Sequence, residues 1–394
     1  MKILVIAMPF SIHTVRWISH INTLEHEIHV FSSYAYSNPH VELKNVIFHD
    51  YYHSITNFDR DIIFSPIWRF EVKSSNILIK KIIGKLFRIL RLEQNREKTL
   101  LKVIKSIRPD IIHSMETQNA GYLVSNIKTS LSKFPFWIHS NWGIDMHYYG
   151  EMDTHRRKII KCLEGVDVLL VEGNRDKVLA NKYGFKQDVL IFPSVGGGFE
   201  IPNKDNIITE LPSKRKTILI KGTQDNVRRG LNSLLALQQC ADFVKGYKIV
   251  LYQCSELLFE KVSFLISECD MDITIVDELS HLEMIELNKI ARISITNNLS
   301  DGLPNSMLEA MLFGAFPIQS NTSCADDWII NGINGILVSP EDIDEIRLAI
   351  KESLINDELV DNAALINFLK IKNSLESNII KNKIAELYMF KQNK

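Results

Sequence analysis

Residues 300–318 read SDGLPNSMLEAMLFGAFPI and join two strand-like runs through a helix. The preceding run, ARISITN, is apolar and predicts a buried parallel strand. Gly302 and Pro304 mark a turn, Asn305 or Ser306 is placed to cap the helix, and Gly314 is placed to end it. The next run, FPIQSN, predicts another strand. Open α/β sheets bind ligands where a strand leads into a helix, and helix N-termini attract anions.

Two carboxylates bracket this loop. Asp301 precedes the predicted helix, and Glu309 follows after seven intervening residues. Glu309 should therefore lie about one turn inside the helix. We expect it to lie beneath a ligand held at the helix start.

Length and composition set the broad class. The chain has 394 residues, which suggests two domains, and its 45% hydrophobic and 24% charged residues are typical of a globular protein. A net charge of −1 gives no general case for nucleic-acid binding. The five cysteines are scattered and odd in number, which favours a reduced, cytoplasmic setting. We expect neither a signal peptide at MKILVIAMPF nor a membrane span, since no apolar run reaches ~18 residues.

Alternating strands and helices fill both halves of the chain and predict two doubly wound α/β domains. We expect an N-terminal domain over residues 1–198, a linker over 199–215 that is rich in polar residues, and a second domain over 216–373. Residues 374–394 should form a helix that packs back across the domains. The first strand lacks a G-x-G-x-x-G loop, which argues against a nicotinamide cofactor.

The N-terminal half carries site candidates in FPFWIHSNWGIDM. His139 and Asp145 fall at or near the end of a predicted strand, where site residues gather in such sheets. A histidine within the strand is equally compatible with a core position.

Residues 69–108 hold twelve basic and three acidic side chains. Within them, ILIKKIIGKLFRILRL begins at Ile77 and ends at Leu92. At helical spacing, its basic residues fall on one side and its aliphatic residues on the other. This pattern predicts an amphipathic helix on an anionic membrane surface. The alternative is a helix that packs on the core and leaves a basic face in solvent.

The strand TILIKG opens the second domain, and TQDNVRRG follows it. Lys221 and the pair Arg228 and Arg229 should thus lie at the same sheet edge as the 301–309 loop. Cations that face a helix N-terminus suit a diphosphate. Three solvated surface charges are the alternative.

These motifs together resemble the retaining glycosyltransferases of family 4, including those of bacterial cell-surface polysaccharides. The family's E-x7-E stretch corresponds here to DGLPNSMLE from Asp301 to Glu309, ILIKGTQDNVRRG resembles its diphosphate loop, and WGID resembles a turn of its N-terminal domain. The chain departs from the family in having Asp301 for the usual glutamate, FSIHT for a Gly-Gly loop, and Trp142 where many relatives have histidine.

The resemblance implies the GT-B fold, with two Rossmann-like domains facing each other across a cleft. It implies that Lys221 and Arg229 hold a donor diphosphate, that Glu309 supports the ribose, and that Asp301 faces the donor sugar. The remaining donor-binding positions carried over are Gly302, Leu303, Pro304, Asn305 and Ser306. Glu309, Asp301, Asp145 and His139 are the catalytic candidates.

The implied reaction moves a sugar from a nucleotide donor, linked to UDP or GDP, to a saccharide acceptor, with no metal and no other cofactor. A lipid-linked acceptor at the cytoplasmic face of the membrane fits the basic helix. Two other functions stay open at this point, a sugar-nucleotide epimerase and a non-catalytic nucleotide-sugar-binding protein.

Overall fold

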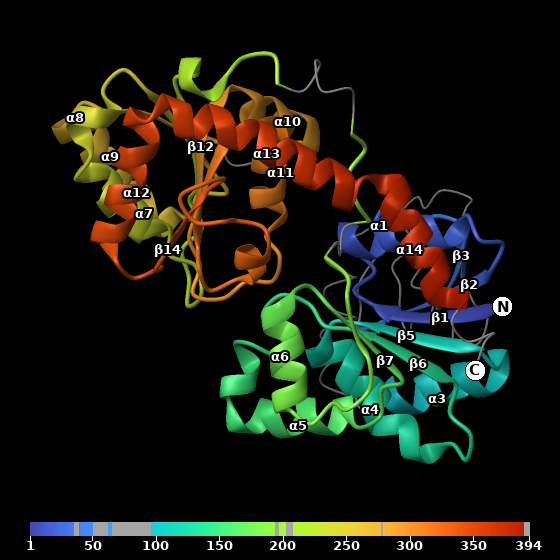
Figure 1. Cartoon of the computed structure of the whole chain (residues 1–394). Helices are drawn as coiled ribbons and strands as arrows, with labels where there is room; N and C mark the ends of the chain where they lie inside the picture. Colours follow the sequence, from blue (N-terminus) through green and yellow to red (C-terminus); the bar gives the residue numbers. More distant parts are fainter. Residues whose placement is uncertain are drawn as a thin grey trace, which may run out of the picture. The chain divides into compact units, whose positions relative to one another are not determined.

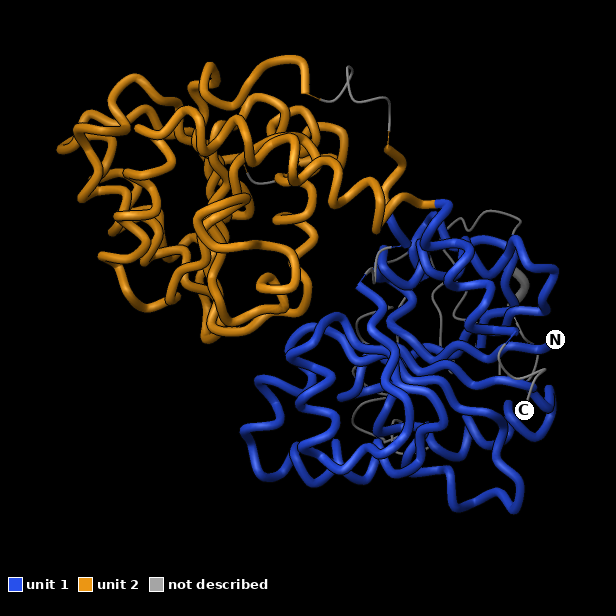
Figure 2. Tube along the Cα trace, in the orientation of Figure 1, with its two compact units in different colours: residues 1–198, 378–394 blue, residues 199–377 orange. Residues whose placement is uncertain are grey.

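The computed structural model describes residues 1–34, 39–49, 62–64, 96–193, 197–201, 208–276 and 279–389. The chain divides into two compact units (Figure 2). Unit 1 consists of Met1–Gly198 and Asn378–Lys394, and unit 2 consists of Phe199–Ser377. The predicted linker therefore belongs to unit 2, and nearly all of the last helix belongs to unit 1.

Unit 1 is built on a parallel sheet of eight strands (Figure 1). These are β1 (Lys2–Ala7), β2 (Glu27–Ser32), β3 (Val46–His49), β4 (Ile62–Phe64), β5 (Ile111–Met115), β6 (Phe136–Ser140), β7 (Val168–Val171) and β8 (Val189–Ile191). They lie in the order β4-β3-β2-β1-β5-β6-β7-β8. Five of the six residues of β1 are buried, as expected for a central strand covered on both faces.

Amphipathic helices pack on this sheet. They are α1 (Ile12–Asn22), α3 (Arg96–Ile107), α4 (Tyr122–Ile127), α5 (Asp153–Leu163), α6 (Asn174–Lys182) and α14 (Ser377–Met389). Ser11 caps α1, where its hydroxyl accepts the N–H of His13 at 3.3 Å. In α3, Leu100, Val103, Ile104 and Ile107 form the buried stripe. The basic segment from Ile77 to Leu92 lies outside the described residues.

The last helix, α14, lies in unit 1 beside α1 (Figure 1). A buried chain of hydrogen bonds joins it to the rest of the unit. Trp17 on α1 donates its indole N–H to the Tyr388 hydroxyl at 3.0 Å. That hydroxyl lies 2.6 Å from Nδ1 of His113 on β5, whose Nε2 lies 2.8 Å from the Ser140 hydroxyl. Each polar atom of the chain is thereby paired, as buried polar groups require. This series of hydrogen bonds ties α14 to both α1 and the sheet.

Unit 2 holds a parallel sheet of six strands. These are β9 (Thr217–Lys221), β10 (Lys248–Tyr252), β11 (Asp272–Val276), β12 (Ala291–Thr296), β13 (Phe316–Ser320) and β14 (Ile336–Val338). Their order is β11-β10-β9-β12-β13-β14, so the direction of strand addition reverses between β9 and β12. Ligands of doubly wound sheets bind outside the carboxyl ends of the strands at such a switch point.

The helices of unit 2 are α7 (Gly230–Gln238), α8 (Ala241–Val244), α9 (Phe259–Cys269), α10 (His281–Ile290), α11 (Asn305–Phe313), α12 (Ile343–Ile355) and α13 (Asp357–Leu375). Gly314 ends α11 in the left-handed conformation, with φ 86°, as predicted. The predicted cap was wrong: Pro304 occupies the N-cap, and no side chain caps the helix. Asn305 and Ser306 are already helical, which leaves their side chains for other contacts. Within the described residues, no helix combines the length and apolarity needed to cross a bilayer.

The end of the predicted linker is anchored in unit 2 by Arg215. The Arg215 side chain is 2% exposed and donates through Nη1 to the carbonyls of Ala291 at 3.0 Å and Phe313 at 3.2 Å. Burial lowers the pKa of Arg215 to about 10. Polar composition suggested a loose segment, but these hydrogen bonds offset the cost of burying the guanidinium.

Candidate functional site

Two loops meet at the carboxyl edge of the unit 2 sheet, after β9 and after β12. The N–H of Arg229 donates to the carbonyl of Asn297 at 3.0 Å, and the N–H of Leu299 donates to that of Val227 at 2.7 Å. The loops are neighbours because β9 and β12 pair directly. The expectation that both lie at one sheet edge is confirmed.

Asp301 shapes the loop that leads into α11. One carboxylate oxygen accepts the N–H of Gly302 at 2.9 Å, and the other accepts the Asn298 side-chain amide at 3.0 Å. Gly302, Leu303 and Pro304 are buried behind it. Asp301 itself is half-buried, and its contact with a donor sugar stays a prediction.

Lys221 ends β9 and is half-buried among charged groups. Burial lowers the pKa of its amine, and the Asp301 and Glu309 carboxylates oppose that shift. Arg228 lowers the pKa further. The structure thus brings Lys221 within electrostatic reach of both carboxylates that bracket the loop.

Glu309 lies on α11, and its side chain is 13% exposed. Its Oε1 lies 3.6 Å from Nδ1 of His281, the first residue of α10. Sequence reasoning did not single out His281. His281 lies in the segment that follows the carboxyl end of β11. Site residues of such sheets gather after the carboxyl ends of strands, so its position in the sequence was a usable signal.

The two arginines of the first loop differ in their surroundings. Arg228 is half exposed and pairs with Asp225 at 2.6 Å. Arg229 is 19% exposed, donates to the carbonyl of Asp225 at 3.1 Å, and has Nε 3.6 Å from Oε1 of Glu341. Arg229 is therefore the more buried of the two, whereas Arg228 is half exposed and paired within the loop.

Tyr252 belongs to the same edge and was missed by the sequence analysis. It ends β10 opposite Lys221 and is 3% exposed. Its side chain packs with Leu219, Val250 and Ala310, which places it beneath α11. Burial, with a contribution from Glu309, raises the pKa of Tyr252 to about 12. Its position at a strand end was the available signal.

At the carboxyl edge of the unit 1 sheet, Asp145 is 5% exposed and accepts the N–H groups of Thr117 at 2.8 Å and Trp142 at 2.9 Å. Glu116, which follows β5, is also buried, with its backbone at φ 76°. Burial raises the pKa of both carboxyls, and Glu116 adds to the shift at Asp145. Sequence reasoning missed Glu116, although it is the last residue of the strand-like run DIIHSME.

His139 is completely buried beside this pair. Its Nδ1 lies 2.8 Å from the Ser114 hydroxyl, and its Nε2 lies 3.0 Å from the Thr117 hydroxyl. Burial lowers the pKa of His139 to about 4. This environment favours a structural role in orienting Thr117, and a catalytic role stays a prediction.

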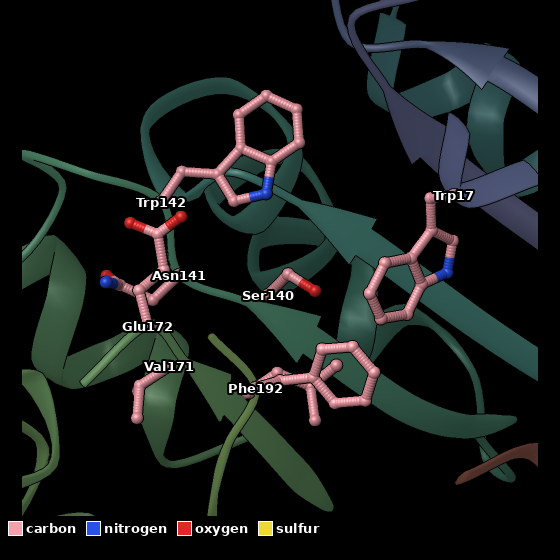
Figure 3. Close-up of a pocket in the computed structure, with 8 residues that line it drawn as sticks. Trp17, Ser140, Asn141, Trp142, Val171, Glu172 and Phe192 are labelled. Atoms are coloured by element: carbon pink, nitrogen blue, oxygen red, sulfur yellow. The ribbon is translucent and has the colours of Figure 1, made fainter. Parts of the chain in front are cut away.

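A small cavity adjoins the end of β6 (Figure 3). The rings of Trp17, Trp142 and Phe192 surround Ser140, and Glu172 lies beside them. Its volume is about 10 Å³, room for roughly one water molecule. It is therefore too small for a sugar. Among the described residues, no group of three or more His, Cys, Asp or Glu could hold a metal ion.

Comparison with known protein families identifies the class of protein to which the chain belongs. Residues 208–365 match the family model of glycosyl transferases group 1, and residues 2–171 match that of the glycosyl transferase 4-like domain. These matches correspond to unit 2 and unit 1. The chain belongs to the glycosyltransferases with the GT-B fold.

Solved structures share the fold at low sequence identity. Sucrose-phosphate synthase from Thermosynechococcus elongatus is 14% identical, with a TM-score of 0.71 over 98% of each chain. The lipopolysaccharide outer core galactosyltransferase WaaB is 16% identical, with a TM-score of 0.67 over 100% of both chains. Anabaena HepE, solved with UDP and glucose, is 13% identical, with a TM-score of 0.66 over 98% of this chain and 99% of that one. No curated protein sequence matches the chain at a significant level.

Proposed function

We propose that this glycosyltransferase moves a hexose from a nucleotide-sugar donor to a saccharide acceptor with retention of the anomeric configuration. The observation that carries the proposal is the gathering of Lys221, Arg229, Asp301 and Glu309 at one sheet edge. α11 begins at the same edge. No single one of these groups is specific, but cations beside a helix N-terminus suit a diphosphate.

In this proposal, Lys221 and Arg229 bind the donor diphosphate, and the first turn of α11 faces it with N–H groups. These positive groups stabilise the negative charge that grows on the departing diphosphate. Glu309 accepts hydrogen bonds from the ribose hydroxyls, and Asp301 with Gly302, Leu303 and Pro304 faces the sugar. The reaction then proceeds without a metal or another cofactor.

The donor base is proposed to be uracil or guanine. Structures of Anabaena HepE contain UDP and UDP-glucose, which makes uridine donors the first to test here. The sequence resemblance alone admits either base.

The acceptor is proposed to bind on unit 1. Asp145, with His139 behind it, holds the Thr117 and Trp142 segments in place and is the proposed support for catalysis on that side. A lipid-linked saccharide of surface-polysaccharide synthesis is the proposed acceptor class, reached from the cytoplasm by peripheral contact through the segment from Ile77 to Leu92.

The test is to incubate the protein with UDP- and GDP-sugars, with and without a membrane lipid extract, and to follow nucleotide release and labelled lipid. Sugar transfer to the lipid fraction, dependent on one donor, is expected. Interconversion of the free nucleotide-sugar without lipid would instead identify an epimerase. Binding without turnover would identify a non-catalytic binding protein.

A further inference from the structure

The Tyr252 hydroxyl is an unused donor behind the proposed donor site. It is inaccessible to solvent and has no hydrogen-bond partner of good geometry within the described part of the chain. Buried hydroxyls normally have a partner, so an unpaired one calls for a physical explanation. The ring belongs to β10 and lies in an apolar cluster that includes Ala310 of α11.

Two side chains lower the pKa of this hydroxyl and so lie close to it: Thr296, which ends β12, and Ser306, in the first turn of α11. Ser306 is half-buried, whereas the Tyr252 hydroxyl is fully covered. A ligand can therefore reach Ser306 but not Tyr252. Because Pro304 is the N-cap and no side chain caps α11, Ser306 is not engaged in capping.

A serine hydroxyl has one proton to donate and two lone pairs that accept. If Tyr252 donates to Ser306 Oγ, the proton of Ser306 is left to point outward. An anion at the start of α11 would accept that proton, together with the helix N–H groups. The hydroxyl of Tyr252 stays protonated at neutral pH, as this relay requires, because burial raises the pKa of Tyr252 to about 12.

We propose that Tyr252 is a positioning residue of the donor site, whose hydroxyl donates to Ser306 when a nucleotide is bound and so directs the Ser306 proton at a donor phosphate. This inference rests on the proposed nucleotide-sugar site and adds to it a residue at the end of β10. It also explains the otherwise unpaired hydroxyl.

The experiment is a double-mutant cycle in the full chain, with UDP and GDP as titrants. Tyr252→Phe should weaken binding of the preferred nucleotide about fivefold, the size of one ordinary hydrogen bond. Ser306→Ala should weaken it by at least as much. The double variant should bind like Ser306→Ala alone, because the relay acts only through Ser306.

Tyr247→Phe is the matched control. Tyr247 is also buried but precedes β10, at the opposite edge of the sheet, and its loss should leave nucleotide binding unchanged. Additive losses in the double variant would overturn the relay, as would wild-type binding by Tyr252→Phe. A fall in the unfolding midpoint of Tyr252→Phe by more than about 5 °C would assign the hydroxyl a structural role and also overturn it. If the wild-type chain binds neither UDP nor GDP, the proposed function fails and this inference fails with it.

Discussion

Oε1 of Glu309 on α11 lies 3.6 Å from Nδ1 of His281 on α10. The contact brings a half-exposed imidazole to a largely buried carboxylate at the edge of the unit 2 sheet, within electrostatic reach of Lys221.

Glu309→Gln should weaken binding of UDP or GDP about tenfold or more, since hydrogen bonds to charged groups contribute about 1.5–3 kcal/mol. Isothermal titration calorimetry measures this change. Glu286→Gln, on the exposed side of α10 where it pairs with Lys289, is the control and should leave affinity unchanged. Donor binding and transfer at wild-type levels in Glu309→Gln would show that the role given to Glu309 is wrong.

Arg229→Ala should reduce nucleotide affinity about tenfold, because a charge-assisted contact to phosphate is lost. Arg228→Ala should change it less than about twofold, since exposed ion pairs such as Arg228 with Asp225 contribute little. The two variants alter adjacent residues and each removes one positive charge. Equal losses would indicate a general electrostatic effect of the loop instead of a specific contact.

Tyr388→Phe should destabilise unit 1 by about 1–3 kcal/mol, because Trp17 and His113 each lose a buried partner. Chemical denaturation gives the change in the free energy of unfolding. Tyr148→Phe, in the same unit with its ring against Tyr149, is the control and should cost less than about 0.5 kcal/mol. A loss no larger than that of the control would show that α14 does not depend on this hydrogen-bond chain.

Acid should destabilise the fold through its buried histidines. Burial lowers the pKa to about 3 for His49 and His113 and to about 4 for His139, from an ordinary value of 6.5. Above pH 6.5 these groups are neutral in both the folded and unfolded states. Below it the unfolded chain binds protons that the folded chain does not, so the free energy of unfolding falls with pH.

The expected loss from about pH 7.5 to about pH 5.5 is on the order of 1 kcal/mol per histidine. Urea denaturation at several pH values measures it. His113→Gln should flatten the pH dependence relative to wild type. The raised pKa values of Glu116 and Asp145 act in the opposite direction, so the comparison of His113→Gln with wild type is the test. An equal pH dependence in the two proteins would contradict the assignment of a neutral buried His113.

The basic segment from Ile77 to Leu92 should bind anionic vesicles. Flotation with phosphatidylserine-containing liposomes should recover the wild-type chain, with each basic residue near the surface contributing about 1 kcal/mol. Replacing Lys80, Lys81, Lys85, Arg88 and Arg91 with glutamate should abolish flotation. The charge-matched control replaces Lys133, Lys161, Lys177, Lys182 and Lys186. Flotation that survives the first set, or no flotation of the wild-type chain, would remove the membrane proposal.

Much of the fold was predictable because apolar strand runs and helix ends are local signals. The runs around Ile3 and Ile293 gave the central strands, and Gly314 gave the end of α11. The start of α11 was predicted wrongly because Pro304, with its fixed φ, occupies the N-cap in place of Asn305 or Ser306.

The residues of the candidate site were predictable only where they belong to a loop whose local sequence resembles a known binding motif. Lys221, Arg229, Asp301 and Glu309 share such loops. Tyr252 and His281 reach the same edge from other strands and helices, and their approach depends on the strand order, which no single stretch of sequence encodes. The buried pair of Glu116 and Asp145 likewise depends on the neighbouring positions of β5 and β6.

The central claim is that the carboxyl edge of the unit 2 sheet binds a nucleotide-sugar. Calorimetric titration of UDP- and GDP-sugars into the wild-type chain and into the Lys221→Met, Arg229→Ala double variant tests it most directly. We predict that at least one donor binds the wild-type chain and that the double variant binds it about a hundredfold more weakly, the loss of two charge-assisted contacts. Equal affinity in both proteins, or no binding of any donor to the wild-type chain, would contradict the claim.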